Sequence, residues 1–160
     1  MMNKPITKQL IKLTINGIEK EVVIRNADTL LHLLREGLGL TGAKSGCNNG
    51  DCGACTVLID GLPINACHIL AIEASGKQIT TIEGLSNTLI QNSFIEQWAI
   101  QCGYCTPGFI LNSYALIQQH PDATDEMIDD WLDSNICRCT GYEEIKTAIK
   151  NLLETRKISG

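Results

Sequence analysis

The 160-residue sequence lacks the features that would assign it to several common functional classes. It contains no run of lysine or arginine and has a formal net charge of −5, so neither nucleic acid nor an anionic membrane surface is an expected partner. No segment approaches the roughly 18 consecutive apolar residues that a membrane span requires. The first thirty residues show no twin arginine and no small-residue cleavage pattern, so we expect a cytoplasmic protein.

The sequence also lacks the motifs of an enzyme that acts alone. It has no Gly-rich dinucleotide fingerprint and no phosphate-binding loop. Its serine, histidine and aspartate residues are scattered and form no recognisable nucleophile elbow. We therefore expect no catalytic residue in this chain, and place any substrate chemistry elsewhere.

Cysteine, in contrast, is abundant, with eight residues in the chain. A reducing cytosol does not maintain structural disulfides, so metal binding is the favoured explanation for so many cysteines. A disulfide framework in an exported protein is the less favoured alternative, because no export signal is visible and the spacings below suit metal.

The first four cysteines, which we call the N-terminal thiol set, are Cys47, Cys52, Cys55 and Cys67. The first three form a C-x4-C-x2-C loop, and a loop of this kind followed by a fourth cysteine is the spacing of plant-type [2Fe–2S] ligation. Zinc is an alternative, but its usual sites pair two short knuckles. The interval of eleven residues before Cys67 is shorter than in plant ferredoxins, which argues against a simple plant ferredoxin.

Three glycines lie in the same loop, namely Gly46, Gly50 and Gly53. A loop that wraps a cluster needs positive φ angles and a close approach of backbone to sulfur, and glycine permits both. The glycines therefore favour a cluster at this loop.

The other four cysteines, the C-terminal thiol set, are Cys102 and Cys105 (C-x2-C) with Cys137 and Cys139 (C-x-C). A C-x2-C pair alone also occurs in zinc knuckles and in thioredoxin-like redox sites. A dithiol redox pair would leave Cys137 and Cys139 without a role. A Rieske centre would need two histidine ligands, which the three histidines of the chain do not offer. We therefore predict a second four-thiolate site.

Periodicity predicts strands in the first half of the chain and helices in the second. Predicted strands cover 10–15, 22–24, 56–59 and 62–64, with a short strand at 79–82, and the turns are Asn16-Gly17 and Asp60-Gly61. A helix capped by Asp28 or Thr29 is expected to end in a left-handed Gly37. The predicted helices of the second half are 89–99, 107–119, 125–134 and 142–153.

Two of these helices begin just after a cysteine. Thr106 followed by Pro107 predicts a cap with proline at the first helical position, and Thr140 with Glu143 predicts a capping box. Helix-start N–H groups are then expected to face anionic sulfur.

Four strings of the sequence resemble the two-cluster iron–sulfur subunits of molybdenum hydroxylases, the group of xanthine dehydrogenase, aldehyde oxidoreductase and carbon monoxide dehydrogenase. The strings occur in the family's order, and the match runs from about Leu10 to Leu153. One departure is Asn49, where many relatives carry an acidic residue. The strings are GDCGACTV (50–57), TIEGL (81–85), QCGYCTPG (101–108) and CRCTGY (137–142).

The resemblance implies an α+β protein with two domains. Residues 1–80 would form a β-grasp ferredoxin-like [2Fe–2S] domain carrying the N-terminal thiol set. Residues 81–160 would form an all-α four-helix-bundle [2Fe–2S]-binding domain carrying the C-terminal thiol set. All eight cysteines would then be metal ligands of two [2Fe–2S] clusters.

The resemblance also implies partners. A large subunit would hold a molybdenum pterin cofactor and a medium subunit would hold FAD, in a heterotrimer or a dimer of heterotrimers. Electrons would leave molybdenum through the helical-domain cluster and reach the flavin, or an external acceptor, through the ferredoxin-like cluster. Gln101 would hydrogen-bond the pterin and Cys139 would admit the electron. Purines, aldehydes, N-heterocycles and carbon monoxide all stay open as substrates.

Two other functions remain as alternatives. A free-standing electron carrier would shuttle between unrelated partners, but it has no evident need of Gln101 at a pterin. A structural zinc protein would contain zinc and no acid-labile sulfide. Metal analysis and co-purification separate the three.

Overall fold

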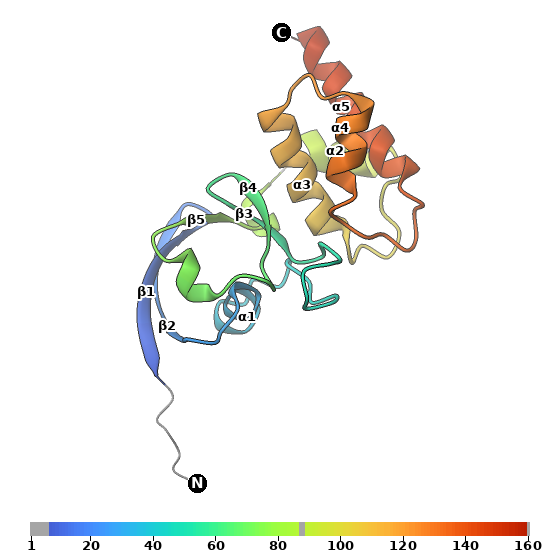
Figure 1. Cartoon of the computed structure of the whole chain (residues 1–160). Helices are drawn as coiled ribbons and strands as arrows, with labels where there is room; N and C mark the ends of the chain where they lie inside the picture. The colour runs from blue at the N-terminus through green and yellow to red at the C-terminus, as the bar shows by residue number, and fades with distance from the viewer. Residues whose placement is uncertain (1–6, 87–88, 160) are drawn as a thin grey trace.

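The chain folds into a sheet half followed by a helical half (Figure 1). The structure is a computed structural model that describes residues 7–86 and 89–159, with side chains as far as residue 155. The outer limits of the two predicted domains, residues 1 and 160, lie outside the described residues. Among the described residues, no helix has the length and apolar character that crossing a membrane would require.

A single mixed sheet of five strands organises the first half. Its strand order is β2-β1-β5-β3-β4, with β1 parallel to β5 and the other neighbours antiparallel. The buried residues of β1 alternate with exposed or half-exposed ones, which is why a period of two predicted this strand. The bounds are β1 (Lys8–Ile15), β2 (Ile18–Arg25), β3 (Thr56–Ile59), β4 (Leu62–Asn65) and β5 (Gln78–Thr80).

Both predicted hairpin turns are confirmed. Asn16 and Gly17 have φ angles of 51° and 80°, and Asp60 and Gly61 have 51° and 84°. Positive φ at both central residues gives the turn whose twist matches the strands that it joins. The predicted strand at 79–82 is shorter and shifted, because the chain turns into the 3₁₀ segment η3 (Ile82–Gly84) after β5.

The helix that packs beside the sheet differs from its prediction. Thr29 caps α1 (Leu30–His32) by accepting a hydrogen bond from the His32 N–H, as one of the two predicted caps. The helix then widens into a π-helical segment, η1 (Leu33–Gly37). The left-handed stop predicted at Gly37 is wrong, since the positive φ of 70° occurs at Gly39, after the wider turn.

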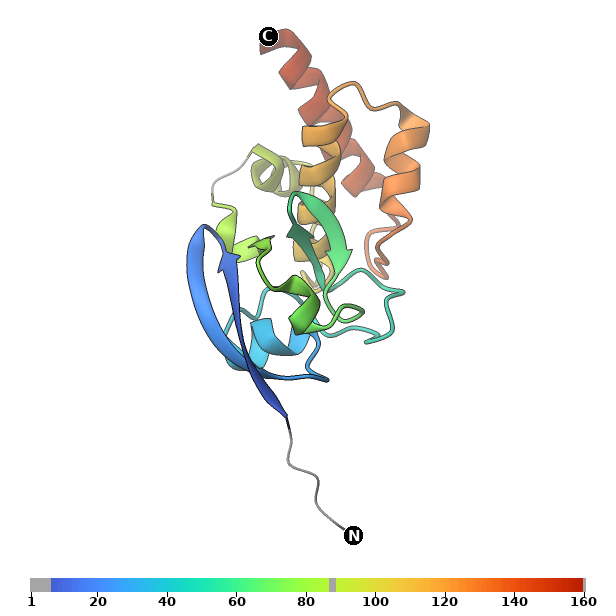
Figure 2. The ribbon, with the colours of Figure 1, turned by 60° about the vertical axis from the view of Figure 1, so that its left-hand side comes forward.

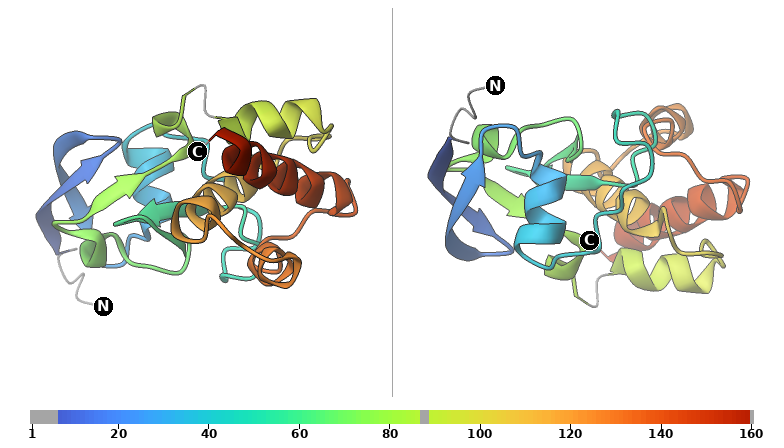
Figure 3. Two further views of the ribbon diagram at one scale, coloured as in Figure 1. Left: turned by 90° about the horizontal axis from the view of Figure 1, so that it is seen from above. Right: turned by 90° about the horizontal axis from the view of Figure 1, so that it is seen from below.

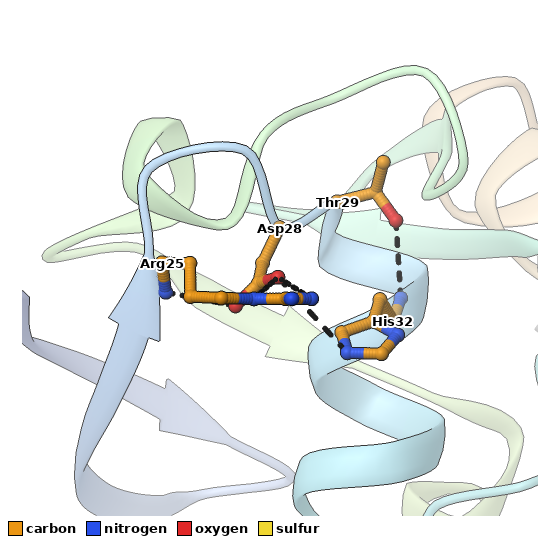
Figure 4. Close-up of polar contacts among 4 residues, drawn as sticks. All are labelled: Arg25, Asp28, Thr29 and His32. Atoms are coloured by element: carbon orange, nitrogen blue, oxygen red, sulfur yellow. Dashed lines mark hydrogen bonds and ion pairs between the residues drawn. The ribbon is translucent and has the colours of Figure 1, made fainter. Parts of the chain in front are cut away.

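The start of this helix is held by an ion pair (Figure 4). Asp28 accepts from the Nε and the backbone N–H of Arg25, both at 2.8 Å, and the His32 ring lies 4.0 Å away. The Arg25 side chain is the main cause that lowers the pKa of Asp28, followed by the Arg25 backbone N–H. Asp28 therefore stays ionised well into the acid range.

Asp28→Asn should lower the midpoint of thermal unfolding by a small amount, because the Arg25 side chain is half exposed and screened. A lowered folded pKa contributes stability above the ordinary pKa of about 3.9, lost only as the pH falls through the lower folded value. The difference in unfolding midpoint between the wild-type protein and Asp28→Asn should therefore not become smaller between about pH 7 and about pH 5. A smaller difference at about pH 5 would contradict the lowered pKa of Asp28.

Four helices form the second half, each close to its prediction but with different ends. α2 (Leu89–Glu96) and α4 (Asp125–Leu132) are shorter than predicted, and α5 (Glu143–Ser159) is longer. α3 (Thr106–Gln119) begins one residue early, so Thr106 is the first helical residue, the predicted cap is wrong, and Cys105 takes the cap position. α2 and α4 each contact both α3 and α5.

The two halves have separate cores and share a third. The sheet half buries a cluster around β1, α1 and β3, and the helical half buries one around α3 and α5. Between them Leu58 of β3 packs with Leu111 and Ala115 of α3. α3 accordingly lies against β3 and β4, as Figure 2 shows. The halves are therefore held in one fixed arrangement.

Candidate metal centres

The loop that carries Cys47, Cys52 and Cys55 extends from the sheet half toward the helices (Figure 3). Its backbone supplies hydrogen-bond donors to sulfur, with the Cys52 N–H 3.4 Å from the Cys47 Sγ. The backbone N–H of Asn49 is the largest influence on the pKa of Cys47, and with those of Cys52 and Asp51 it lowers this pKa to about 6. The loop is therefore built to hold a thiolate at this position.

Two of the predicted loop glycines are required by space. A Cβ on Gly46 would lie 2.6 Å from the Cys52 Sγ, so a side chain there would displace the thiol. Gly53 has a φ of 65°, and a Cβ there would lie 2.5 Å from the Ser134 carbonyl oxygen. The predicted close approach to sulfur is confirmed at Gly46, and the predicted positive φ is confirmed at Gly53 and at Gly50, whose φ is 90°.

The remaining two thiols of the N-terminal set lie deeper. Cys55 and Cys67 are both buried, at the start of β3 and after β4. Burial raises the pKa of Cys55 to about 12; the Cys67 backbone N–H opposes this rise and the Cys67 side chain adds to it. Burial disfavours an unpaired thiolate, so Cys55 and Cys67 are expected to lose their protons when a cation binds between them.

The C-terminal thiol set contains a similar sulfur with several donors. The Thr140 hydroxyl donates to the Cys137 Sγ at 3.1 Å, and the Thr140 N–H lies 3.4 Å from the same atom. Burial alone would raise the pKa of Cys137, but Thr140, the Cys139 N–H and the Cys105 side chain outweigh it and lower this pKa. The Tyr142 hydroxyl accepts from the Cys137 N–H at 3.1 Å, which fixes the loop further.

The capping box predicted at Thr140 and Glu143 is wrong. α5 begins at Glu143, and the Lys146 N–H bonds the Tyr142 carbonyl, so Tyr142 precedes the helix. The Thr140 hydroxyl instead accepts a hydrogen bond from the Tyr142 N–H and donates one to the Cys137 Sγ. The donors to sulfur therefore come from the loop and not from a helix start.

The two sides of the C-terminal set differ in exposure. Burial, followed by the side chain of Cys137, raises the pKa of Cys105 to about 12. Cys102 and Cys139 are both exposed, and the Cys102 side chain is the main cause that raises the pKa of Cys139. The set thus has an inner pair, in which Cys137 is buried and Cys105 is partly buried, and a surface pair, Cys102 and Cys139.

The donor set fits a two-iron cluster. A [2Fe–2S] cluster takes four thiolates on two irons, so its ligands fall into pairs. The eight cysteines, all in the described part of the chain, are free thiols without disulfides. In each of four pairs the side chain of one cysteine shifts the pKa of the other: Cys47 with Cys52, Cys55 with Cys67, Cys105 with Cys137, and Cys102 with Cys139.

The two cysteine-bearing loops contact each other directly. The Ile136 N–H donates to the Cys52 carbonyl at 3.0 Å, so a residue next to Cys137 is bonded to a cysteine of the other set. Asn135 donates from Nδ2 to the Gly53 carbonyl at 2.8 Å. In addition, the Tyr104 hydroxyl donates to the Ser45 carbonyl at 2.9 Å. The two sets are therefore neighbours in space although they are distant in sequence.

Gln101 is exposed next to Cys102, on the side of the surface pair. The histidines lie elsewhere: His32 beside Asp28, and His120 edge-on against Trp131. His68 is exposed after Cys67 and its ring faces Gly50. The sequence analysis did not predict that Asn135, Thr140 and Tyr142 hydrogen-bond the two cysteine-bearing loops. Their only signal in the sequence was their position close to Cys137 and Cys139.

Comparisons with known proteins agree with this geometry. Residues 13–78 match the family described as 2Fe-2S iron-sulfur cluster binding domain. Residues 81–150 match the family described as [2Fe-2S] binding domain. Each matched region contains one thiol set.

The chain is similar to whole subunits of known enzymes. It is 44% identical to the nicotinate dehydrogenase small FeS subunit of Eubacterium barkeri, over 93% of this chain and 98% of that protein. It is 38% identical to the nicotine 6-hydroxylase small subunit of Paenarthrobacter nicotinovorans, over 91% of this chain and 90% of that protein. A chain of quinoline 2-oxidoreductase from Pseudomonas putida 86 superposes with a TM-score of 0.89 at 38% identity, covering 94% of this chain and 97% of that chain.

Proposed function

The chain belongs to the family of two-cluster iron–sulfur small subunits of molybdenum hydroxylases, and from this we propose that it is the electron-transfer subunit of such an oxidoreductase. Electrons would pass from a molybdenum pterin on a large subunit, by way of the C-terminal and then the N-terminal thiol set, to FAD or an external acceptor. The chain carries two [2Fe–2S] clusters, one for each matched domain. Each cluster, when bound, supplies a one-electron carrier.

We propose that the two thiol sets provide all eight ligands. The support is the pairing of the thiols and the donors that surround Cys47 and Cys137. Backbone and hydroxyl groups that donate to sulfur stabilise its negative charge, and hydrogen bonds of this kind also set the potential of a cluster. The chain would therefore both hold the clusters and tune them.

The observation that carries the relay is the contact between the two loops. The hydrogen bond from the Ile136 N–H to the Cys52 carbonyl joins a loop of each set without an intervening element. The shared core of Leu58, Leu111 and Ala115 holds the halves together beneath it. A chain that passes electrons internally needs this fixed neighbourhood of its two sites.

We propose that electrons enter at the surface pair, Cys102 and Cys139, with Gln101 bonding the pterin and Cys139 lying beside it. These three side chains are exposed, whereas Cys55 and Cys137 are buried. Large apolar side chains next to the pair in sequence are also exposed, which suits burial under a partner subunit. They are Ile100, Tyr104, Ile136 and Tyr142.

The proposed partners are a large subunit with molybdenum pterin and a medium subunit with FAD, in a heterotrimer or a dimer of heterotrimers. The relatives are named as small subunits, which supports an assembly of several chains. Their names mention nicotinate and nicotine, and that of a structural neighbour mentions quinoline. Substrate choice would lie in the large subunit, so these names do not decide it.

We also propose the finer architecture that the sequence suggested, with domains at 1–80 and 81–160 and a β-grasp fold in the first. The four helices of the second half would form a bundle. Its support is the closed ring of contacts, in which α2 and α4 each pack on α3 and α5. A bundle gives both cysteine pairs of the C-terminal set a rigid base.

Purification of the chain from its native cells, under mild conditions, tests the function. We expect it to elute with a molybdenum-containing chain and a flavin-containing chain, with iron and acid-labile sulfide in the same fractions. A monomer with iron and sulfide alone would instead indicate a free-standing electron carrier. Zinc without sulfide would indicate a structural metal protein and would overturn the proposal.

A further inference from the structure

A buried carboxamide connects the two cysteine-bearing loops. Asn135 is only 2% exposed and lies two residues before Cys137. Its Nδ2 donates to the carbonyl of Gly53, which lies between Cys52 and Cys55, at 2.8 Å. One side chain therefore bonds the backbone of the N-terminal set from within the loop of the C-terminal set.

Both ends of this carboxamide have hydrogen-bond partners. Nδ2 also lies 3.4 Å from the Thr56 hydroxyl oxygen. Oδ1 accepts from the Ser134 hydroxyl at 2.9 Å and from the Asn112 Nδ2 at 3.1 Å. The amide has one orientation, because a flip would set Oδ1 against the Gly53 carbonyl oxygen at 2.8 Å.

The network extends into both halves. Asn112 of α3 is also 2% exposed, and its Nδ2 shares two hydrogens among the Trp131 carbonyl at 2.7 Å, the Ser134 hydroxyl at 2.8 Å and the Asn135 Oδ1 at 3.1 Å. On the other side, the Thr56 hydroxyl of β3 donates to the Gly53 carbonyl at 2.7 Å. A fully satisfied buried polar network specifies one arrangement of the parts that it joins.

The backbone of α3 also packs against the hydrogen bond between Asn135 and Gly53. A Cβ on Gly108 of α3 would lie 2.3 Å from the Gly53 carbonyl oxygen and 3.0 Å from the Asn135 Nδ2. The backbone of α3 therefore rests directly on the bond between the two loops. No side chain fits there without moving Gly53, Asn135 or the helix.

We propose that Asn135 is a positioning residue that sets the distance and orientation between the two iron–sulfur sites, with Gly108 as the surface against which it is held. This role rests on the proposed function, because it takes the two thiol sets as the cluster ligands. Asn135 contacts no thiol in the described network, so it would act on the relation between the clusters and not on either cluster itself.

The test is the magnetic interaction between the two reduced clusters in the assembled, dithionite-reduced protein. Asn135→Asp keeps the shape of the side chain but replaces the donor with oxygen that repels the Gly53 carbonyl. We expect iron and sulfide contents and both individual EPR signals to persist, while the splitting that arises from their interaction is lost. Asn26→Asp makes the same chemical change at a side chain that accepts a hydrogen bond from the exposed Gln9, and should keep the splitting.

Gly108→Ala disturbs the contact between α3, Gly53 and Asn135 without changing a polar group. If Asn135→Asp does not retain both clusters, the test rests on Gly108→Ala. Loss of the splitting in Gly108→Ala with both signals present supports the proposal. An unchanged splitting in Gly108→Ala, or in Asn135→Asp where both clusters are retained, would overturn it, even if the variant unfolds at a lower temperature. Failure of the wild-type protein to show two cluster signals would refute the proposed function instead, before any variant is compared.

Discussion

Replacing Cys52 with serine is expected to remove the cluster of the N-terminal thiol set and to leave the other cluster in place. The two sets share no residue, and the bond that Cys52 makes to the second loop uses its backbone carbonyl, which the substitution keeps. A serine hydroxyl ionises far less readily than a thiol and is a harder ligand. Iron content should fall by half, with one of two EPR signals lost.

Asp51→Asn is the matched control for this change. Asp51 is exposed in the same loop, next to Cys52, and accepts a hydrogen bond from the Asn49 side chain. It should retain both signals. Loss of both signals in Cys52→Ser, with the control intact, would contradict two independent sites.

Replacing Cys137 with alanine is expected to abolish the cluster of the helical half. Cys137 is buried and its Sγ accepts hydrogen bonds from the hydroxyl and the N–H of Thr140, and an alanine methyl group cannot bind iron in its place. The EPR signal of the N-terminal set should persist. Electron delivery from a molybdenum-containing partner should stop, because the entry site is lost.

Thr140→Val is the informative companion, since it removes the hydroxyl donor and leaves every cysteine. We expect both clusters to form and the reduction potential of the cluster on the C-terminal thiol set to be lower. The reason is that hydrogen bonds to sulfur stabilise the reduced, more negative state of a cluster. Two intact clusters and unchanged electron flow in Cys137→Ala would show that Cys137 does not belong with Cys102 and Cys105.

Local chemistry made part of the fold predictable. The Asn16-Gly17 and Asp60-Gly61 turns follow from residues that tolerate positive φ, whatever surrounds them. The π-helical turn after α1, whose Leu33 and Leu34 lie in the core of the sheet half, has no signal in the local sequence, and the left-handed residue is Gly39. At α5 the hydroxyl that was predicted to cap the helix, that of Thr140, donates to the Cys137 Sγ instead.

In the candidate site too, local sequence predicts some features, whereas others depend on contacts between distant residues. The thiol sets could be predicted because their spacing along the chain carries the chemistry. Asn135 could not, since its partner Gly53 is 82 residues away and a lone asparagine beside a cysteine motif has no distinctive pattern. Thr140 was assigned to a helix cap from its spacing to Glu143, whereas its hydroxyl donates to Cys137 in the folded chain.

Quantitative metal and sulfide analysis of the purified native protein tests the presence of two clusters most directly. With two irons in each of two clusters, the protein should be coloured and contain about four irons and about four acid-labile sulfides per chain. A colourless protein with fewer than about two irons per chain, its thiols free or bound to zinc, would contradict the presence of the clusters.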